Sequence, residues 1–171
     1  LAFKLFKKYR IHPQIWKTAH SPRNGTQKSK INEAVKEILP LVKKTRELGC
    51  KLGLYNHGGW GGEPENLASV CKILHDQHNA THVGIVYNFH HGHNHINDFN
   101  KALKLMHPYL LCININGMNS NANPKILPIG QGDHEIEMIK ELKKINYDGP
   151  IGILDHRSDT DTKTALQLNI T

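Results

Sequence analysis

The residues best suited to chemistry are amides and imidazoles that follow short apolar segments of the chain. Each apolar segment is typical of a strand, so these side chains stand where strands would end. The candidates are Asn56, His57, Asn88, His90, His91, Asn114, Asn116, Asp155, His156 and Arg157. Neutral imidazoles together with amide or carboxylate oxygens can hold a borderline divalent ion such as Mn, Co or Zn.

The densest cluster of such residues is the histidine-rich segment 88–95 (NFHHGHNH). His91 lies three residues beyond the strand-terminal Asn88 and is the better ligand candidate. His93 and His95 fit a solvated loop that caps the next helix, because consecutive and alternate spacing is not a stereotyped ligand pattern.

A glycine-rich loop, 58–62 (GGWGG), follows the strand that Leu52 and Leu54 predict. Glycines allow backbone conformations closed to other residues, and Pro64 suits the first turn of a helix. Trp60 could stack on a sugar ring. A tight turn with a packed aromatic side chain explains the same residues equally well.

Carboxylates are few at these strand ends. Asp155 alone stands close to one, and Glu63 and Glu65 begin a helix, where the helix dipole accounts for them. Glycosidase chemistry with paired carboxylates therefore has weak support. The chain shows neither a Ser, His and Asp arrangement nor a phosphate-loop motif.

Amphipathic helices are expected between the apolar segments. The predicted strands cover 9–16, 51–55, 82–87, 109–115 and 149–154. Apolar spacing predicts a helix over 30–49, which Pro40 should kink or divide. Four further helices are expected. The first should end near Asn79 and the second at His107. The third should begin with Asp133 as its N-cap, and the last near Asp159.

The chain repeats a strand, a polar segment at the strand's end and an amphipathic helix at intervals of roughly thirty residues. This repeat is typical of the βα units of a parallel sheet. Apolar strands without alternation support burial on both faces. We therefore predict an α/β fold of TIM-barrel-like (β/α) repeats with a parallel sheet, in one domain over residues 1–171.

A complete eight-stranded barrel needs about 250 residues, whereas this chain has 171. Its first residue is Leu1, and residues 1–8 (LAFKLFKK) resemble the end of a helix. We therefore expect a partial barrel that lacks its natural start and its N-terminal βα units.

The chain is basic, with 22 Lys and Arg against 15 Asp and Glu and a formal charge of +7. These charges are spread along predicted helices, which favours solvated helix faces over a nucleic-acid groove with clustered charges. An anionic small substrate is compatible with this charge.

Three cysteines, Cys50, Cys71 and Cys112, sit inside apolar patterns and are expected to be buried thiols. No apolar run approaches the 18 residues of a membrane span. The compartment is left open with a slight preference for the cytoplasm, and the oligomeric state is left open too.

With these motifs the chain resembles the sugar-phosphate isomerase/epimerase superfamily, the xylose-isomerase-like barrels that also include the endonuclease-four type of repair enzyme. The resemblance is carried by 52–59 (LGLYNHGG), 88–91 (NFHH), 129–133 (IGQGD) and 149–154 (GPIGIL). These segments occur in the expected order and resemble the last four or so βα units.

Usual members of that superfamily hold a divalent metal with a Glu, an Asp, a His and a Glu from successive strand ends. The matching positions here are Tyr55, Asn88, Asn114 and Leu154, so all four depart from the pattern. The accessory histidine is present as His91. The resemblance thus leaves two possibilities: a metal site rebuilt from His57, Asn88, His91 and His156, or a barrel that no longer binds metal in that manner.

The resemblance implies proton abstraction next to a sugar carbonyl, with Mn, Co or Zn polarising that oxygen. His57 or His156 could replace the missing carboxylate base, because the pKa of imidazole lies near neutrality. The predicted metal ligands are Asn88, His91 and Asn114. The predicted contacts to a sugar or sugar phosphate are Asn56, Trp60, Asn116, Gln131, Asp155 and Arg157.

Three functions follow as alternatives. The first is a metal-dependent isomerase, epimerase or keto-sugar lyase. The second is a non-catalytic carbohydrate-binding or degenerate barrel that uses Trp60, Asn56 and Asn114. The third, suggested by the basic charge alone, is a DNA repair enzyme of the endonuclease-four type.

Overall fold

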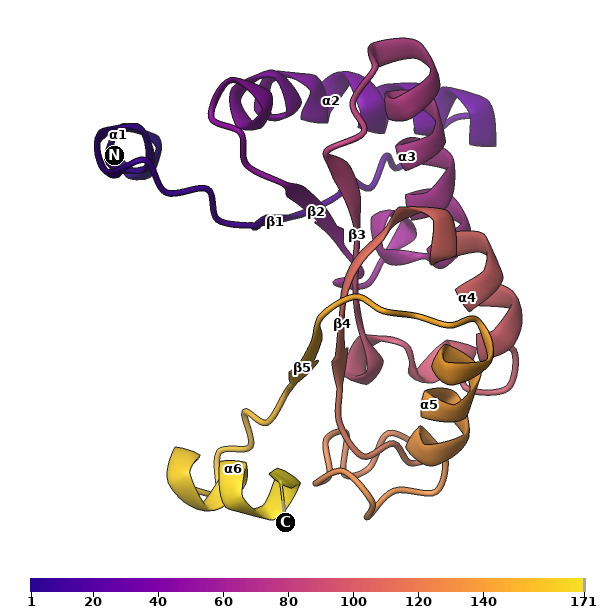
Figure 1. Ribbon diagram of the computed structural model, residues 1–171. Coiled ribbons are helices and arrows are strands. Elements are labelled where there is room, and N and C mark those ends of the chain that lie inside the picture. Colours follow the sequence, from indigo (N-terminus) through magenta and orange to yellow (C-terminus); the bar gives the residue numbers. More distant parts are fainter. Residues whose placement is uncertain (171) are drawn as a thin grey trace. The chain divides into compact units, whose positions relative to one another are not determined.

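The computed structural model describes residues 1–170, which form two compact units, residues 1–86 and the residues from 87 onward (Figure 1). The expectation of one domain over residues 1–171 stays a prediction.

The described residues contain a sheet with the strand order β1-β2-β3-β4-β5. The strands are β1 (Ile15–Thr18), β2 (Leu52–Tyr55), β3 (Val83–Asn88), β4 (Leu110–Ile115) and β5 (Ile151–Ile153). β2 pairs in parallel with β1 and with β3, and β4 pairs in parallel with β5. The predicted parallel sheet with alternating helices is therefore confirmed.

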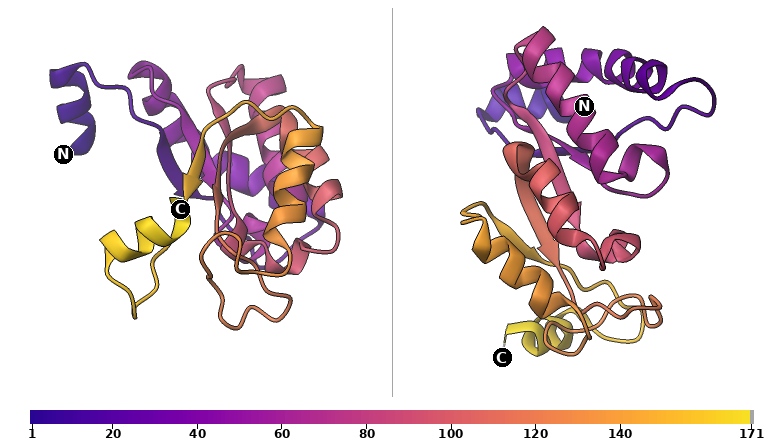
Figure 2. Two further views of the ribbon diagram at one scale, coloured as in Figure 1. Left: turned by 60° about the horizontal axis from the view of Figure 1, so that its bottom comes forward. Right: turned by 90° about the vertical axis from the view of Figure 1, so that its right-hand side faces the viewer.

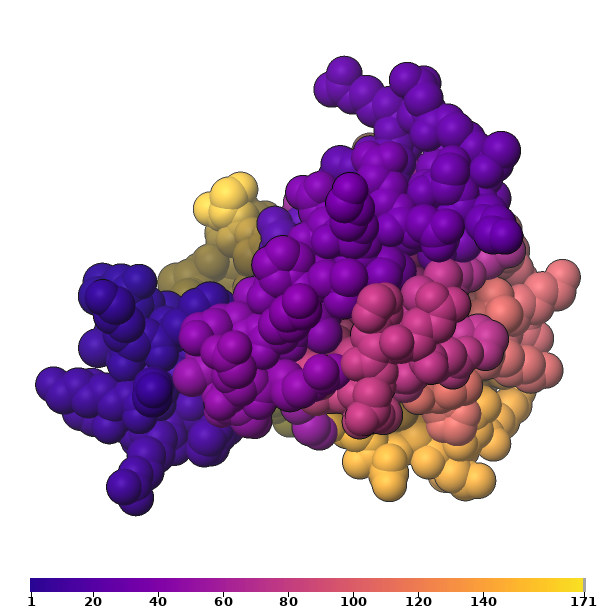
Figure 3. Space-filling view, turned by 90° about the horizontal axis from the view of Figure 1, so that it is seen from above, coloured from indigo at the N-terminus to yellow at the C-terminus, as the bar shows by residue number. Residues whose placement is uncertain are grey.

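In the first unit, two long helices pack together beside the strands (Figure 1). Its helices are α1 (Ala2–Tyr9), α2 (Gln27–Glu47) and α3 (Pro64–His78), with a 3-10 turn at Trp60–Gly62. α2 packs against α3 (Figure 1), and its residues Val35, Ile38 and Val42 are buried with Leu52 and Leu54 of β2. The outer side of α2 forms part of the molecular surface (Figure 3).

Two expectations for the first unit are wrong. The strand predicted over 9–16 begins only at Ile15, because α1 continues to Tyr9 and Arg10 ends it in the left-handed region with φ 52°. Of the two effects expected of Pro40, division of the helix is wrong, because α2 runs unbroken through it, and a kink stays a prediction. Pro40 is exposed, and the buried side chains on both sides of it hold the helix against the core.

In the second unit, one helix precedes β4, one lies between β4 and β5, and one follows β5. They are α4 (Phe99–Met106), α5 (Glu135–Lys144) and α6 (Thr162–Ile170), with 3-10 turns at Phe89–His91, His93–His95 and His107–Tyr109. α4 packs against α5 (Figure 2). Tyr87, Phe89 and Phe99 form an aromatic cluster with ring centroids 5.4–6.5 Å apart.

Two helix starts differ from expectation. α5 has His134 rather than Asp133 at its N-cap, because the Glu135 carboxylate organises the preceding loop. α6 begins at Thr162, after Asp161 Oδ1 accepts hydrogen bonds from the backbone N–H groups of Lys163 and Thr164. Such an aspartate is a standard helix cap.

The three cysteines are buried thiols, as predicted. Within residues 1–170, no helix combines the length and the apolar character that crossing a bilayer requires.

Candidate functional site

In the first unit, the end of β2 presents both a buried amide and an exposed imidazole. Asn56 is buried, and its backbone N–H donates to the Val86 carbonyl at 3.3 Å. His57 is exposed, and its ring centroid lies 5.4 Å from that of Tyr55. Tyr55 in turn lies 5.9 Å from Trp16 of β1, which is 45% exposed. Sequence reasoning missed Trp16, whose strand was predicted to end there.

Trp60 is tied into the fold by a closed set of hydrogen bonds. Its indole N–H donates to Gln27 Oε1 at 3.1 Å, and the Gln27 amide donates to Asn66 Oδ1. The Asn66 amide donates back to the Trp60 carbonyl oxygen at 2.7 Å. Trp60 therefore holds the glycine-rich loop against α2 and α3, and its predicted stacking on a sugar stays a prediction.

A pocket of about 520 Å³ lies beside His57 in the first unit. It runs from the end of β1 to the middle of α2. Its polar lining includes Lys17, His20, Ser21, Glu37 and His57.

In the second unit, two predicted metal ligands bind each other. The Asn114 amide on β4 donates a hydrogen bond to Asn88 Oδ1 on β3, and both side chains are buried. Asn114 Oδ1 accepts from the Cys112 thiol at 3.8 Å. A side chain at Gly152 of β5 would collide with Asn114 Oδ1, so the glycine provides the space that the amide occupies.

A histidine cluster follows β3. His90 is only 4% exposed, and its ring centroid lies 3.6 Å from that of His91 and 5.2 Å from that of His156. Its Nδ1 atom is buried without a hydrogen-bond partner. Burial lowers the pKa of His90 to about 3, with a further contribution from positive neighbours, so this ring is neutral at neutral pH.

Two further polar atoms near the strand ends are also buried and unpartnered. Asn116 donates to the Gly117 carbonyl at 2.8 Å, but its Oδ1 has no partner. His93 Nδ1 lies 3.0 Å from the His90 carbonyl oxygen, and its Nε2 has no partner. Burial also lowers the pKa of His93.

Glu135 is a fully buried carboxylate that sequence reasoning missed. Its two oxygens accept hydrogen bonds from the backbone N–H groups of Met118, Gly130 and Gly132 at 2.9–3.0 Å. These bonds hold the loop between β4 and α5, which carries the exposed Gln131. No local signal identifies this role, because a glutamate in a first helical turn normally only complements the dipole.

Asp155 and Arg157 are paired with each other. Arg157 Nε and an Arg157 terminal nitrogen each donate to Asp155 at 2.9 Å, and Asn169 of α6 donates to the same carboxylate at 3.0 Å. The Arg157 hydrogen bond lowers the pKa of Asp155. His156, between them in sequence, is exposed.

The residues present do not fit a divalent metal in this arrangement. Among residues 1–170, no three His, Cys, Asp or Glu side chains are grouped so that they could hold an ion. Two of the three predicted ligands, Asn88 and Asn114, already accept hydrogen bonds through their side-chain oxygens.

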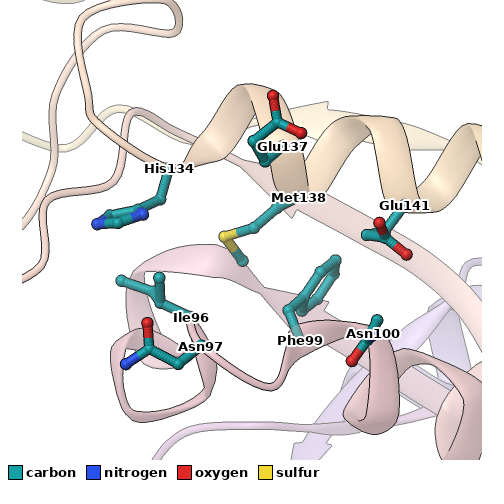
Figure 4. Close-up of a pocket in the computed structure, with 8 residues that line it drawn as sticks. All are labelled: Ile96, Asn97, Phe99, Asn100, His134, Glu137, Met138 and Glu141. Atoms are coloured by element: carbon teal, nitrogen blue, oxygen red, sulfur yellow. The ribbon is translucent and has the colours of Figure 1, made fainter.

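A separate pocket of about 220 Å³ lies between α4 and α5 (Figure 4). Phe99 and Met138 contribute apolar atoms, and Glu137 and Glu141 contribute carboxylates. Lys140 and Lys144 already pair with these two carboxylates. This pocket is therefore a groove between helices with satisfied charges.

Parallel βα repeats with polar side chains at the carboxyl ends of the strands define a protein of the α/β-barrel class, which builds its ligand sites at those ends. The model of the xylose isomerase-like TIM barrel family matches residues 5–169. The chain therefore belongs to this family, as its motifs predicted.

Known proteins similar to this chain are longer than it is. An uncharacterized protein of Methanocaldococcus jannaschii is 26% identical over 147 residues, which cover 82% of this chain and 46% of that protein. The chain thus spans about half the length of this curated relative.

Two solved structures share the fold. D-psicose 3-epimerase from Clostridium cellulolyticum H10, crystallised with D-tagatose, has a TM-score of 0.69 at 14% identity, over 98% of this chain and 64% of that one. The IolI protein with a bound zinc atom has the same TM-score and identity, over 98% of this chain and 63% of that one. These two matches confirm the barrel-like fold. They also confirm that this chain covers only part of such a barrel.

The structure thus brings Asn88, Asn114, His91 and His156 into one unit with His90. Sequence reasoning preferred His91 to His90 because of its spacing from Asn88. No local pattern would have found His90, because the chain turns into a 3-10 helix at Phe89–His91 directly after β3.

Proposed function

We propose that this chain binds a sugar at the carboxyl ends of its strands and catalyses proton transfer next to the sugar carbonyl, as an isomerase or epimerase. The supporting observation is the pair of buried, unpartnered atoms His90 Nδ1 and Asn116 Oδ1 after β3 and β4. An unpaired buried polar group costs about 1–3 kcal/mol. Sugar hydroxyls both donate and accept hydrogen bonds, so a sugar would supply the missing partners.

The proton-transfer group in this proposal is His156. It is exposed, and its ring lies 5.2 Å from that of His90, so a ligand that contacts the cluster can reach it. A histidine can both remove and return a proton near neutral pH. His57 stays a proposed second acid–base group in the first unit, with Asn56 and the β2 loop as its neighbours.

Binding without catalysis is the second candidate. The mutual hydrogen bond of Asn88 and Asn114 favours it, because these amides stand where the family resemblance expects metal-binding side chains. Asp155 is also not the base in this proposal, because its carboxylate accepts hydrogen bonds from Arg157.

Proton exchange separates the two candidates. The chain is incubated with D-tagatose or D-fructose in D₂O, and loss of the proton next to the carbonyl is followed by proton NMR. We expect exchange in the unmodified chain and a fall of about 10²-fold or more in His156→Gln, the size of a lost general base. Sugar affinity, measured by calorimetry, should change little in this variant.

His107→Gln is the matched control, because His107 is an exposed histidine of the same unit outside the cluster. It should exchange at the unmodified rate. Sugar binding without any exchange would support the non-catalytic candidate, and exchange that persists in His156→Gln would remove His156 from its role.

A further inference from the structure

The pocket beside His57 has two walls of different chemical character. Lys17 of β1 and His57 after β2 belong to the first, which we call the strand-end wall. Glu37, Ile38 and Leu41 belong to the second, the α2 wall. All of these residues lie in the first unit. The volume of about 520 Å³ is within the usual range of small-molecule sites.

Each wall carries one formally charged side chain, Lys17 on the strand-end wall and Glu37 on the α2 wall. Both are exposed, and among residues 1–170 neither forms an ion pair or a side-chain hydrogen bond. Other ions nearby have partners, since Glu33 lies 3.0 Å from His20 Nε2. The pocket therefore offers one positive and one negative group to a ligand.

Pro40 adds a backbone acceptor to the α2 wall. It lies inside α2 and lines the pocket. Because proline has no N–H, the carbonyl of Lys36, four residues earlier, cannot receive the usual helical hydrogen bond. This carbonyl directly precedes Glu37 in the chain. The α2 wall thus collects hydrogen-bond acceptors, opposite the ammonium of Lys17.

The loop at the end of β1 is fixed against the glycine-rich loop. Ser21 Oγ accepts a hydrogen bond from the Gly61 N–H at 2.8 Å. A side chain at Gly61 would collide with the Ala19 carbonyl oxygen, so the two backbones are in direct contact. Ala19 and Ser21 line the pocket. A wall that is already ordered loses little conformational entropy when a ligand binds.

We propose that this pocket binds a zwitterion with an apolar side chain, an amino acid or a short peptide. The ammonium of the ligand donates to the Glu37 carboxylate and the Lys36 carbonyl, and its carboxylate accepts from Lys17. Such charge-assisted hydrogen bonds are the strong ones. The apolar side chain covers Ile38 and Leu41. This site is separate from the proposed function, whose supporting unpartnered atoms lie in the second unit.

Calorimetry tests this proposal with four probes: L-leucine, L-leucyl-L-leucine, isocaproate and isoamylamine. Isocaproate is leucine without its ammonium, and isoamylamine is leucine without its carboxylate. We expect one zwitterion to bind at least about tenfold tighter than either singly charged analogue, the size of a hydrogen bond to a charged group. A preference for leucine identifies an amino acid, and a preference for leucyl-leucine identifies a peptide.

Two substitutions assign the two ends of the ligand. Lys17→Gln should weaken the preferred zwitterion about tenfold and leave isoamylamine binding unchanged. Glu37→Gln should weaken the zwitterion similarly and leave isocaproate binding unchanged. Lys43→Gln and Glu65→Gln are the matched controls and should change no affinity, because both residues are exposed in the first unit outside the pocket.

Three results would overturn the proposal. The first is an absence of binding by both zwitterions, and the second is equal affinity for the zwitterions and the two analogues. The third is tight zwitterion binding that neither Lys17→Gln nor Glu37→Gln weakens, which would place the ligand elsewhere on the chain.

Discussion

At the scale of single residues, the partner of a polar side chain decides its role. Asn88 and Asn114 carry both a donor and an acceptor, so one amide can satisfy the other inside the protein. An aspartate at position 88 could accept the same hydrogen bond, but its buried negative charge would need a cation or further donors. The oxygens of Asn88 and Asn114 thus each have a partner, whereas His90 Nδ1 and Asn116 Oδ1 do not.

Glu135→Gln should destabilise the second unit by about 3 kcal/mol, because an amide nitrogen would face backbone N–H donors that now bind a buried carboxylate. Urea unfolding at pH 7 measures the change. Glu137→Gln changes an exposed glutamate in the same first turn of α5 and should stay within about 0.5 kcal/mol. Equal effects of the two substitutions would contradict the anchoring role of Glu135.

At the scale of elements, one hydrogen-bonded group joins α6 to two loops. The Asn169 amide donates to Asp155 after β5, and its oxygen accepts from the Ile129 N–H in the loop before α5. Asp155 is in turn held by Arg157. These contacts position His156 from both sides, so the helix contributes to the site without supplying a chemical group.

Acid should weaken this junction. The pKa of Asp155 is lowered in the folded chain, chiefly by the Arg157 hydrogen bond. A lowered pKa adds stability above the ordinary pKa, about 3.9, and this stability is lost as pH falls through the lower folded value. Urea unfolding at pH 6 and pH 3 should therefore show a smaller acid loss in Asp155→Asn than in the unmodified chain.

Asp133→Asn is the control for the pH series, since Asp133 is exposed. Its acid loss should match that of the unmodified chain. If Asp155→Asn loses as much stability on acidification as the unmodified chain, the Asp155 and Arg157 pair does not couple folding to pH.

At the scale of the whole chain, the family determines the fold, and the residues at the strand ends determine the proposed chemistry. The chain belongs to the xylose isomerase-like TIM barrel family, and one similar structure contains zinc. The described residues do not gather a comparable set of ligands. In the proposed function, the sugar is therefore held by hydrogen bonds.

Sugar binding should therefore be unaffected by EDTA. Calorimetry with D-fructose 6-phosphate, with and without the chelator, tests this, and plasma mass spectrometry on protein without a histidine tag measures bound metal. We expect metal well below one ion per chain and equal affinities. Near-stoichiometric Mn, Co or Zn that EDTA removes together with binding would support the metal centre predicted at Asn88, His91 and Asn114.

The sequence by itself determined the βα order, the parallel sheet, the buried cysteines and the strand ends that carry Asn56, Asn88 and Asn114. These features follow from local apolar spacing, which burial imposes on each element separately. The predicted start of β1 and the predicted N-cap of α5 were wrong. The first depends on a turn and the second on a carboxylate, and neither belongs to the apolar spacing.

Only the tertiary structure decided which polar groups meet. Asn88 and Asn114 are separated by 26 residues, and Asp155 and Asn169 by 14. The choice of His90 over His91 as the buried ring depends on the 3-10 turn after β3. Such pairings depend on the register and spacing of whole strands and loops, and no local periodicity in the chain encodes them.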